Sequence, residues 1–115
     1  MFRRFSLPLA LVSALAVPAV AHAADEAGAS GFIESLQIND DGGTGYLAFH
    51  GRIVVAKKNA SAEYRWGGLS CGSRTLSEGQ VSLLTQALAN GLQITPYHVP
   101  GQGTTQCLVG FTLTN

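Results

Sequence analysis

The chain has 115 residues, with seven basic and seven acidic side chains and a formal net charge of zero. This length suits one domain with one modest core and is too short for two. No run of Lys and Arg of the kind that neutralises phosphate groups is present, so the composition argues against nucleic acid as a partner.

The first 23 residues have the pattern of a secretory signal peptide. Two arginines at positions 3–4 give a positive start, residues 7–20 are almost continuously apolar, and Ala21–Ala23 places alanine at both small-residue positions of a cleavage site. We expect cleavage after Ala23, with Ala24 as the near alternative. The sequence therefore predicts an exported chain, secreted or periplasmic.

Processing would leave residues 24–115 as one folded domain with five basic and seven acidic side chains. No second apolar stretch of about 18 residues follows, so we expect no membrane span. In an oxidising compartment, the pair Cys71 and Cys107 predicts one structural disulfide. A metal site is the alternative, but two thiols without a nearby histidine do not make a zinc site. We expect no metal and no cofactor.

The sequence of residues 24–115 predicts a loose leader at residues 24–30, followed by three strands, one helix and two further strands. The expected elements are strands at residues 31–38, 46–56 and 64–71, a helix from Ser77 to Gly91, and strands at residues 92–99 and 105–114. Asn, Asp and Gly at residues 39–45 predict a turn. Pro96 lacks a ladder donor and predicts an edge or a bulge. Alternation in the last strand directs Cys107, Val109, Phe111 and Leu113 inward and leaves Leu108 outward.

The helix has signals at both ends. Ser77 and Gln80 have the spacing of a capping box, in which each side chain bonds the backbone N–H of the other residue. Gly91 predicts a left-handed cap at the end. The expected apolar stripe consists of Val81, Leu84 and Leu88, with Ala87 beside it.

This order of elements, β-β-β-α-β-β, is the connectivity of the five-stranded OB barrel. The sequence therefore predicts a mainly β fold, an OB barrel with one α-helix. Another small antiparallel β fold that carries a helix is the alternative.

Catalytic machinery is hard to assemble from the chain, so we expect a binding protein rather than an enzyme. Neither His50 nor His98 belongs to a nucleophile motif, and His50 falls on the outward side of its strand. Asp40 and Asp41 lack the further ligand that calcium requires. Trp66 could stack on a ligand, but burial in the core or an interface is the favoured interpretation.

Short segments spread over most of residues 30–111 match one known family in order and spacing. They are Ser30-Gly31, Tyr46 after a polar turn, Leu84-Thr85-Gln86-Ala87-Leu88, the stretch from Gly91 to Pro100-Gly101, and Leu108-Val109-Gly110. On these segments the chain resembles the binding subunits of bacterial AB5 toxins, of the subtilase cytotoxin and typhoid toxin type.

The resemblance implies an OB barrel, a ring of five identical subunits, and binding of sialylated cell-surface glycans. It also implies an exported catalytic subunit as a partner. A family serine that holds the sugar corresponds to Ser30, and a family tyrosine falls at Tyr97 or His98, with the ungapped count favouring His98. The helix is about one turn shorter here, and Cys71–Cys107 is not the cysteine arrangement of that family.

Two other functions remain open on the sequence. Small disulfide-bonded β domains also serve as secreted or periplasmic protein-binding modules such as enzyme inhibitors. A structural protein without a small ligand is the third hypothesis. Function depends on the site rather than on the fold, so the spatial arrangement of Ser30, Tyr97 and His98 bears on the choice between these hypotheses.

Overall fold

The computed structural model describes residues 25–39 and 48–115. The expected signal peptide, most of the first turn and the start of the second expected strand lie outside the described residues. The elements are β1 (Glu26–Ala27), β2 (Gly31–Ile38), β3 (Gly51–Ala56), β4 (Ser61–Trp66), α2 (Gly68–Cys71), α3 (Glu78–Asn90), β5 (Gln93–Pro100) and β6 (Gln106–Thr114).

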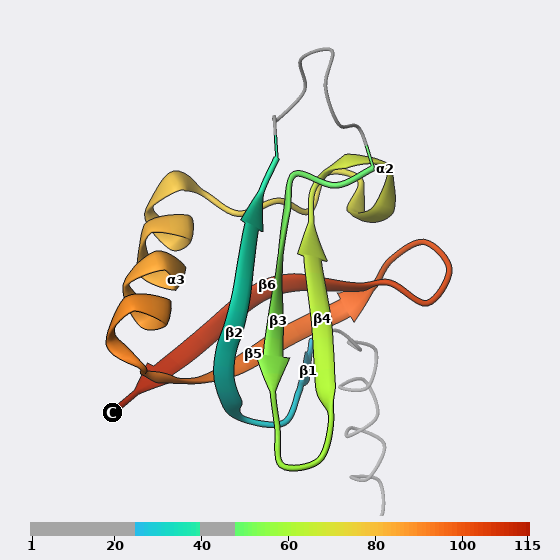
Figure 1. Cartoon of the computed structure of the whole chain (residues 1–115). Coiled ribbons are helices and arrows are strands. Elements are labelled where there is room, and N and C mark those ends of the chain that lie inside the picture. The colour runs from blue at the N-terminus through green and yellow to red at the C-terminus, as the bar shows by residue number, and fades with distance from the viewer. Residues whose placement is uncertain (1–24, 40–47) are drawn as a thin grey trace, which may run out of the picture.

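Five strands, β2 to β6, form a closed barrel (Figure 1). β2, β3 and β4 make an antiparallel meander, and β5 pairs antiparallel with both β2 and β6. A parallel contact between β4 and β6, at Arg65 and Cys107, closes the circle. α3 follows β4 in the chain and packs against β2. This is the OB-like barrel that the sequence predicted, with one long helix between its third and fourth strands.

The supposed leader contributes a sixth strand. β1 pairs antiparallel with β5, with Glu26 opposite His98 and Ala27 opposite Tyr97. The expectation of a loose leader at residues 24–30 is therefore wrong for residues 26–27. The composition of this stretch is polar and small, and its order comes from the open edge of β5 that it covers.

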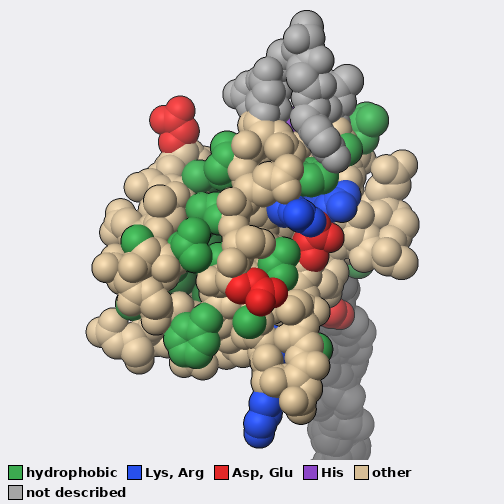
Figure 2. Space-filling view, in the orientation of Figure 1, with side chains coloured by type: hydrophobic (Ala, Val, Ile, Leu, Met, Phe, Trp, Pro, Cys, Tyr) green, Lys and Arg blue, Asp and Glu red, His purple; other side chains and the backbone are tan. Residues whose placement is uncertain are grey.

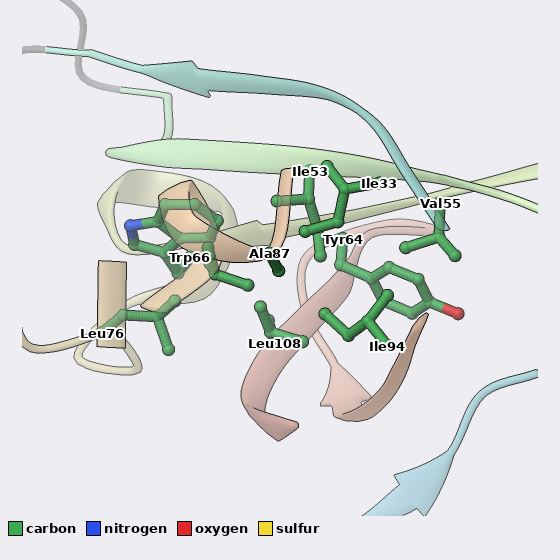
Figure 3. Close-up of a cluster of buried hydrophobic side chains, with 10 residues drawn as sticks. Ile33, Ile53, Val55, Tyr64, Trp66, Leu76, Ala87, Ile94 and Leu108 are labelled. Carbon is green, nitrogen blue, oxygen red and sulfur yellow. The ribbon is translucent and has the colours of Figure 1, made fainter. Parts of the chain in front are cut away.

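The main core fills the barrel and extends under α3 (Figure 3). Trp66 is only 3% exposed, which confirms its expected burial. On α3 the barrel covers Leu84 and Ala87 but leaves Leu88 exposed, so the expected stripe is wrong at Leu88. The buried members of the core are Ile33, Ile53, Val55, Tyr64, Trp66, Leu76, Leu84, Ala87, Ile94 and Leu108.

The second and third strands start or end at other residues than the sequence predicted. β3 begins only at Gly51, and residues 48–50 precede it without strand pairing. The hairpin turn is tight, because Lys57 N–H donates to the Ala60 carbonyl, so β4 begins already at Ser61. It ends at Trp66 because Gly67 and Gly68 adopt positive φ and turn the chain into α2.

A bulge in β6 reverses the expected orientation of Leu108. Tyr97 pairs with Gly110 and His98 with Leu108, so Val109 is the extra residue. Leu108 consequently lies fully buried in the main core, whereas Cys107 and Val109 belong to a second cluster. The strict alternation expected for this strand is wrong at Leu108 and Val109, because the inserted residue shifts the parity there, whereas Phe111 and Leu113 pack against the main core as expected.

Pro96 is buried within β5, next to this bulge. It lies between the part of β5 that pairs with β2 and the part that pairs with β1, and its carbonyl accepts a hydrogen bond from Gly28 N–H. Its missing N–H faces the gap between the two partner strands, so no ladder bond is lost.

The predicted disulfide is present. Cys71 of α2 and Cys107 of β6 are bonded, with their Cα atoms 5.7 Å apart, and both side chains are buried against Val99 and Val109. The bond ties α2 to the strand that closes the barrel. Within the described ranges, no helix is long and apolar enough to cross a membrane.

Replacing both cysteines with serine (Cys71→Ser, Cys107→Ser) should lower the free energy of unfolding by about 4 kcal/mol, because the bond closes a loop between residues 36 positions apart. Urea unfolding without reductant measures the loss. Reductant should weaken the wild-type chain to the level of the variant and leave the variant unchanged. Equal stability of the variant and the oxidised wild type would contradict the structural role of the bond.

Candidate functional site

Two of the three predicted contact residues, Ser30 and Tyr97, meet at the outer surface of β5 and β6, Tyr97 within β5 and Ser30 just before β2. Ser30 Oγ lies 2.5 Å from Thr95 Oγ1, and Tyr97 Oη lies 2.9 Å from Thr112 Oγ1. Thr95 and Thr112 are directly paired across the two strands, which joins both contacts into one row. We call Ser30, Thr95, Tyr97 and Thr112 the hydroxyl patch. It presents four adjacent hydroxyl groups and one aromatic ring on an accessible surface.

His98 lies elsewhere. Neighbouring residues of a strand point to opposite faces, and His98 follows Tyr97 directly in β5. Its ring packs against Tyr64, with the ring centroids 5.3 Å apart, and Tyr64 belongs to the barrel core. The structure therefore brings Ser30 and Tyr97 together and separates His98 from them.

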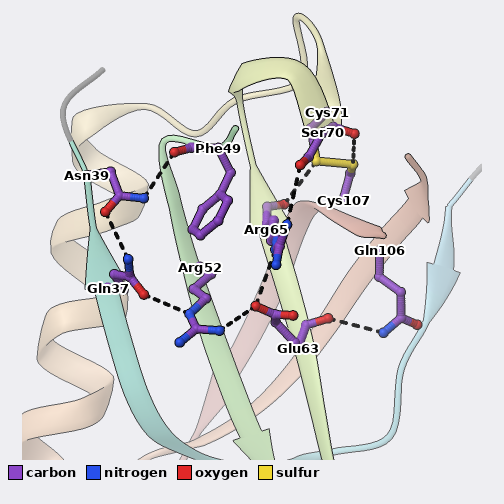
Figure 4. Close-up of polar contacts among 10 residues, drawn as sticks. All are labelled: Gln37, Asn39, Phe49, Arg52, Glu63, Arg65, Ser70, Cys71, Gln106 and Cys107. Carbon is purple, nitrogen blue, oxygen red and sulfur yellow. Dashed lines mark hydrogen bonds and ion pairs between the residues drawn. A yellow bond between two sulfur atoms is a disulfide. The ribbon is translucent and has the colours of Figure 1, made fainter. Parts of the chain in front are cut away.

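A second polar site, which the sequence did not predict, occupies the outer surface of β3 and β4 (Figure 4). Glu63 Oε2 accepts hydrogen bonds from Arg52 at 2.7 Å and from Arg65 at 3.2 Å. The Arg65 guanidinium also lies over the Phe49 ring, 4.2 Å from its centroid. We call Arg52, Glu63 and Arg65 the ionic cluster. Figure 2 shows basic and acidic side chains side by side on this face.

The arginines fix the charge of Glu63. Partial burial by itself raises the pKa of the Glu63 carboxyl group, because burial disfavours the charged form. The hydrogen bonds and positive charges of Arg52 and Arg65 outweigh this effect and hold the pKa below its ordinary value. Glu63 is therefore ionised at neutral pH, and opposite charges stand next to each other on this surface.

Beside the ionic cluster lies a hollow of about 650 Å³, between β4 and the loop that joins β5 to β6. We call it the polar hollow. Its lining residues carry hydroxyl, amide, carboxylate and guanidinium groups and include no aromatic side chain. They are Ser61, Ala62, Glu63, Arg65, Ser70, Gln102, Gly103, Thr104, Thr105 and Gln106.

A third site is an apolar hollow of about 510 Å³ between the end of β2 and the start of α3. Trp66 and Leu76 contribute to its wall from the core, and the exposed Ile38 lies at its border. His50 also lines it, with Nδ1 3.3 Å from Thr75 Oγ1. His50, which the sequence placed on the outward side of its strand, is partly buried, and its backbone N–H donates to the Trp66 carbonyl.

Part of the ionic cluster could have been predicted from the sequence. Glu63 and Arg65 alternate with the buried Tyr64 and Trp66, which directs both charged side chains to the same outer face. The polar hollow could not be found in this way, because its other wall comes from a loop some forty residues further along the chain. Within the ranges that the structure describes, no group of three or more His, Cys, Asp or Glu residues is arranged to hold a metal ion.

Comparisons with known proteins found no matching family model, no matching curated protein and no matching solved structure. The likeness to AB5 binding subunits consequently stays a prediction from the sequence.

Changing Glu63 to Gln should reduce the stability of the chain by about 1 kcal/mol near neutral pH, because the two arginines lose their ionic partner at a partly exposed site. A lowered native pKa means that this contribution is full at high pH and is lost as the pH falls through the native value. The difference between the two proteins should therefore shrink towards zero as the pH falls below about 4.5.

Urea unfolding at several pH values measures this difference. In a chain that already carries Arg52→Gln and Arg65→Gln, the Glu63→Gln change should have little effect at any pH, since the groups that lower the pKa are gone. A pH-independent loss in the wild-type background would contradict the assignment.

Proposed function

We propose that this chain is an exported carbohydrate-binding subunit of the AB5 toxin B type, and that the hydroxyl patch is its sugar-binding surface. The observation that carries the proposal is the row formed by Ser30, Thr95, Tyr97 and Thr112. Each hydroxyl group both donates and accepts hydrogen bonds, as sugar hydroxyls do. The Tyr97 ring adds a flat apolar surface beside them, which suits the apolar face of a pyranose ring.

The fold supports the proposal without deciding it. OB barrels bind oligosaccharides in several families, and their use varies with the residues on their surface. The buried Cys71–Cys107 disulfide fits a chain that leaves the reducing cytosol. An exported catalytic subunit as partner follows only from the resemblance and belongs to the proposal.

Assembly into a ring is also part of the proposal. Leu83 and Leu88 are exposed on α3, on either side of the buried stripe that faces the barrel. Two exposed leucines on one helix give an apolar surface that contact with a second copy could bury. Five copies of a weak sugar site would bind a cell surface together far more strongly than one copy.

Loss of single hydroxyl groups from the patch should weaken glycan binding. Ser30→Ala and Tyr97→Phe each remove one hydrogen-bonding group, and we expect each to lower the affinity of a single site by about 5- to 150-fold. A glycan array that includes sialylated glycans measures binding of the intact assembly. Titration with the best array ligand in monovalent form gives the affinity of a single site.

His98→Ala serves as the matched control, because the His98 ring lies on the opposite face of β5. We expect it to change the affinity less than twofold, whereas a loss as large as that of Ser30→Ala would favour the alternative alignment with the family. Absence of binding to every glycan by the intact protein would overturn the proposal. The apolar hollow beside Ile38 and Trp66 would then favour the protein-binding alternative.

The ring makes a separate prediction about size. Light scattering of the processed chain should give about five times the mass of one subunit. Leu83→Glu with Leu88→Glu should convert it to a monomer, because two charges would be buried in the contact. Leu69→Glu, which changes an exposed leucine on α2, is the control and should leave the mass unchanged. A wild-type monomer at high micromolar concentration would contradict assembly.

A further inference from the structure

The polar hollow is separate from the hydroxyl patch, which lies on the outer surface of β5 and β6. Its walls are the outer surface of β4 and the loop at residues 102–105. In barrel order, β4 is the third strand, and this loop joins the fourth strand to the fifth. OB barrels commonly bind ligands between the face of their second and third strands and this loop. The hollow therefore lies where the fold favours a ligand.

The loop wall of the hollow is held in place by the rest of the chain. Gly101 N–H donates to the Thr105 carbonyl at 2.9 Å, and Thr105 N–H donates to the Gln102 carbonyl at 3.1 Å. Gln102 N–H donates to the Ser70 carbonyl at 2.9 Å, which ties the loop to α2. Gly101 packs so closely on Cys107 Sγ that a side chain would not fit. A wall that is already ordered loses little entropy when a ligand binds.

The charges of the hollow select for a ligand without net charge. Glu63 and Arg65 both line it, and they are bonded to each other. Among the lining residues, an anionic ligand would meet the Glu63 carboxylate and a cationic ligand would meet the Arg65 guanidinium, so each would meet a like charge. A neutral ligand that both donates and accepts hydrogen bonds can use both groups.

The unused hydrogen-bonding capacity points to hydroxyl groups on that ligand. Both arginines bond Glu63 through Oε2, and Oε1 has no hydrogen-bond partner among the described residues. Gln106 Nε2 donates to the Glu63 carbonyl at 3.2 Å, which leaves the amide oxygen of Gln106 to accept from a ligand. The lining also lacks any aromatic side chain on which a nucleobase or an aromatic ring would stack.

We infer that the polar hollow is a second binding site, for a neutral saccharide whose hydroxyl groups donate to Glu63 and accept from Arg65. Thr105 and Gln106 supply further hydrogen bonds from the loop and from β6. The inference does not depend on the hydroxyl patch, since the two sites share no residue.

The test is a titration of the ¹⁵N-labelled processed chain, followed by NMR. The probes are the methyl glycosides of glucose, galactose, mannose and N-acetylglucosamine, with glucuronate and glucosamine as charged comparators. We expect at least one neutral glycoside to shift the amide signals of residues 61–65 and 102–106 in a saturable way. The charged comparators should bind at least about 5-fold more weakly, because each meets a like charge in the hollow.

Thr105→Val removes one hydroxyl group from the loop wall at nearly constant volume and should weaken that glycoside about 5-fold or more. Thr112→Val makes the same change in the hydroxyl patch and should leave binding in the hollow unaltered. Glu63→Gln should weaken binding as well, and its spectrum reports whether the fold is retained.

The inference would be overturned if no neutral glycoside, at concentrations up to about 50 mM, caused a saturable shift at residues 61–65 and 102–106. Such a result would mean a dissociation constant well above that concentration. Equal or tighter binding of glucuronate or glucosamine in the hollow would also overturn the inference. Shifts confined to Ser30, Thr95, Tyr97 and Thr112 would refute the second site while supporting the proposed function, so the two failures are distinguishable.

Discussion

The short parallel contact between β4 and β6 is the constraint on which the rest of the structure depends. It pairs Arg65 with Cys107 and turns a curled sheet into a closed barrel. Cys107 also forms the disulfide with Cys71 of α2, and Arg65 belongs to the ionic cluster on the outer surface, where it bonds Glu63. One position in the ladder thus joins barrel closure, covalent tethering and the best-defined polar surface. The polar hollow lies beside this position, between β4 and the loop before β6.

The side chains of β4 point alternately to the inside and the outside of the barrel. Tyr64 and Trp66 fill the core, while Glu63 and Arg65 face outward, and Glu63 accepts hydrogen bonds from Arg65 and from Arg52 of the neighbouring strand. The large aromatic side chains inside fix the position of the strand through close packing. The outward charges therefore project from a strand that the core holds in place.

Local signals in the sequence were sufficient to predict α3. Several features that depend on contacts between residues distant in the sequence could not be predicted. Both hydrogen bonds of the capping box at Ser77 and Gln80 are present, and Gly91 adopts the left-handed cap, because these contacts involve only near neighbours in the chain. The bulge at Val109 could not be predicted, since it depends on the register against β5 and nothing in β6 itself marks it. β1 was missed for the same reason, because the strand it pairs with, β5, is distant in the sequence. For the site, the sequence named Ser30 and Tyr97 but not Thr95 and Thr112, whose proximity exists only across paired strands.

The family tyrosine corresponds to either Tyr97 or His98, and these two consecutive strand residues point to opposite faces of β5. Tyr97 and His98 are consecutive, so an alignment shifted by one position moves the predicted contact from the outer surface to the side that faces the core. Ser30 bonds Thr95, and Thr95 and Tyr97 lie on the same face of β5. If Ser30 holds a ligand, as we propose, that ligand reaches the Tyr97 hydroxyl and ring without crossing the strand, whereas the His98 ring packs on Tyr64. The geometry favours Tyr97 as the partner of Ser30, although the ungapped count favours His98. Side-chain direction is the stronger argument here, because one gap in a loop changes the count, whereas no change in a loop brings two consecutive strand residues to the same face.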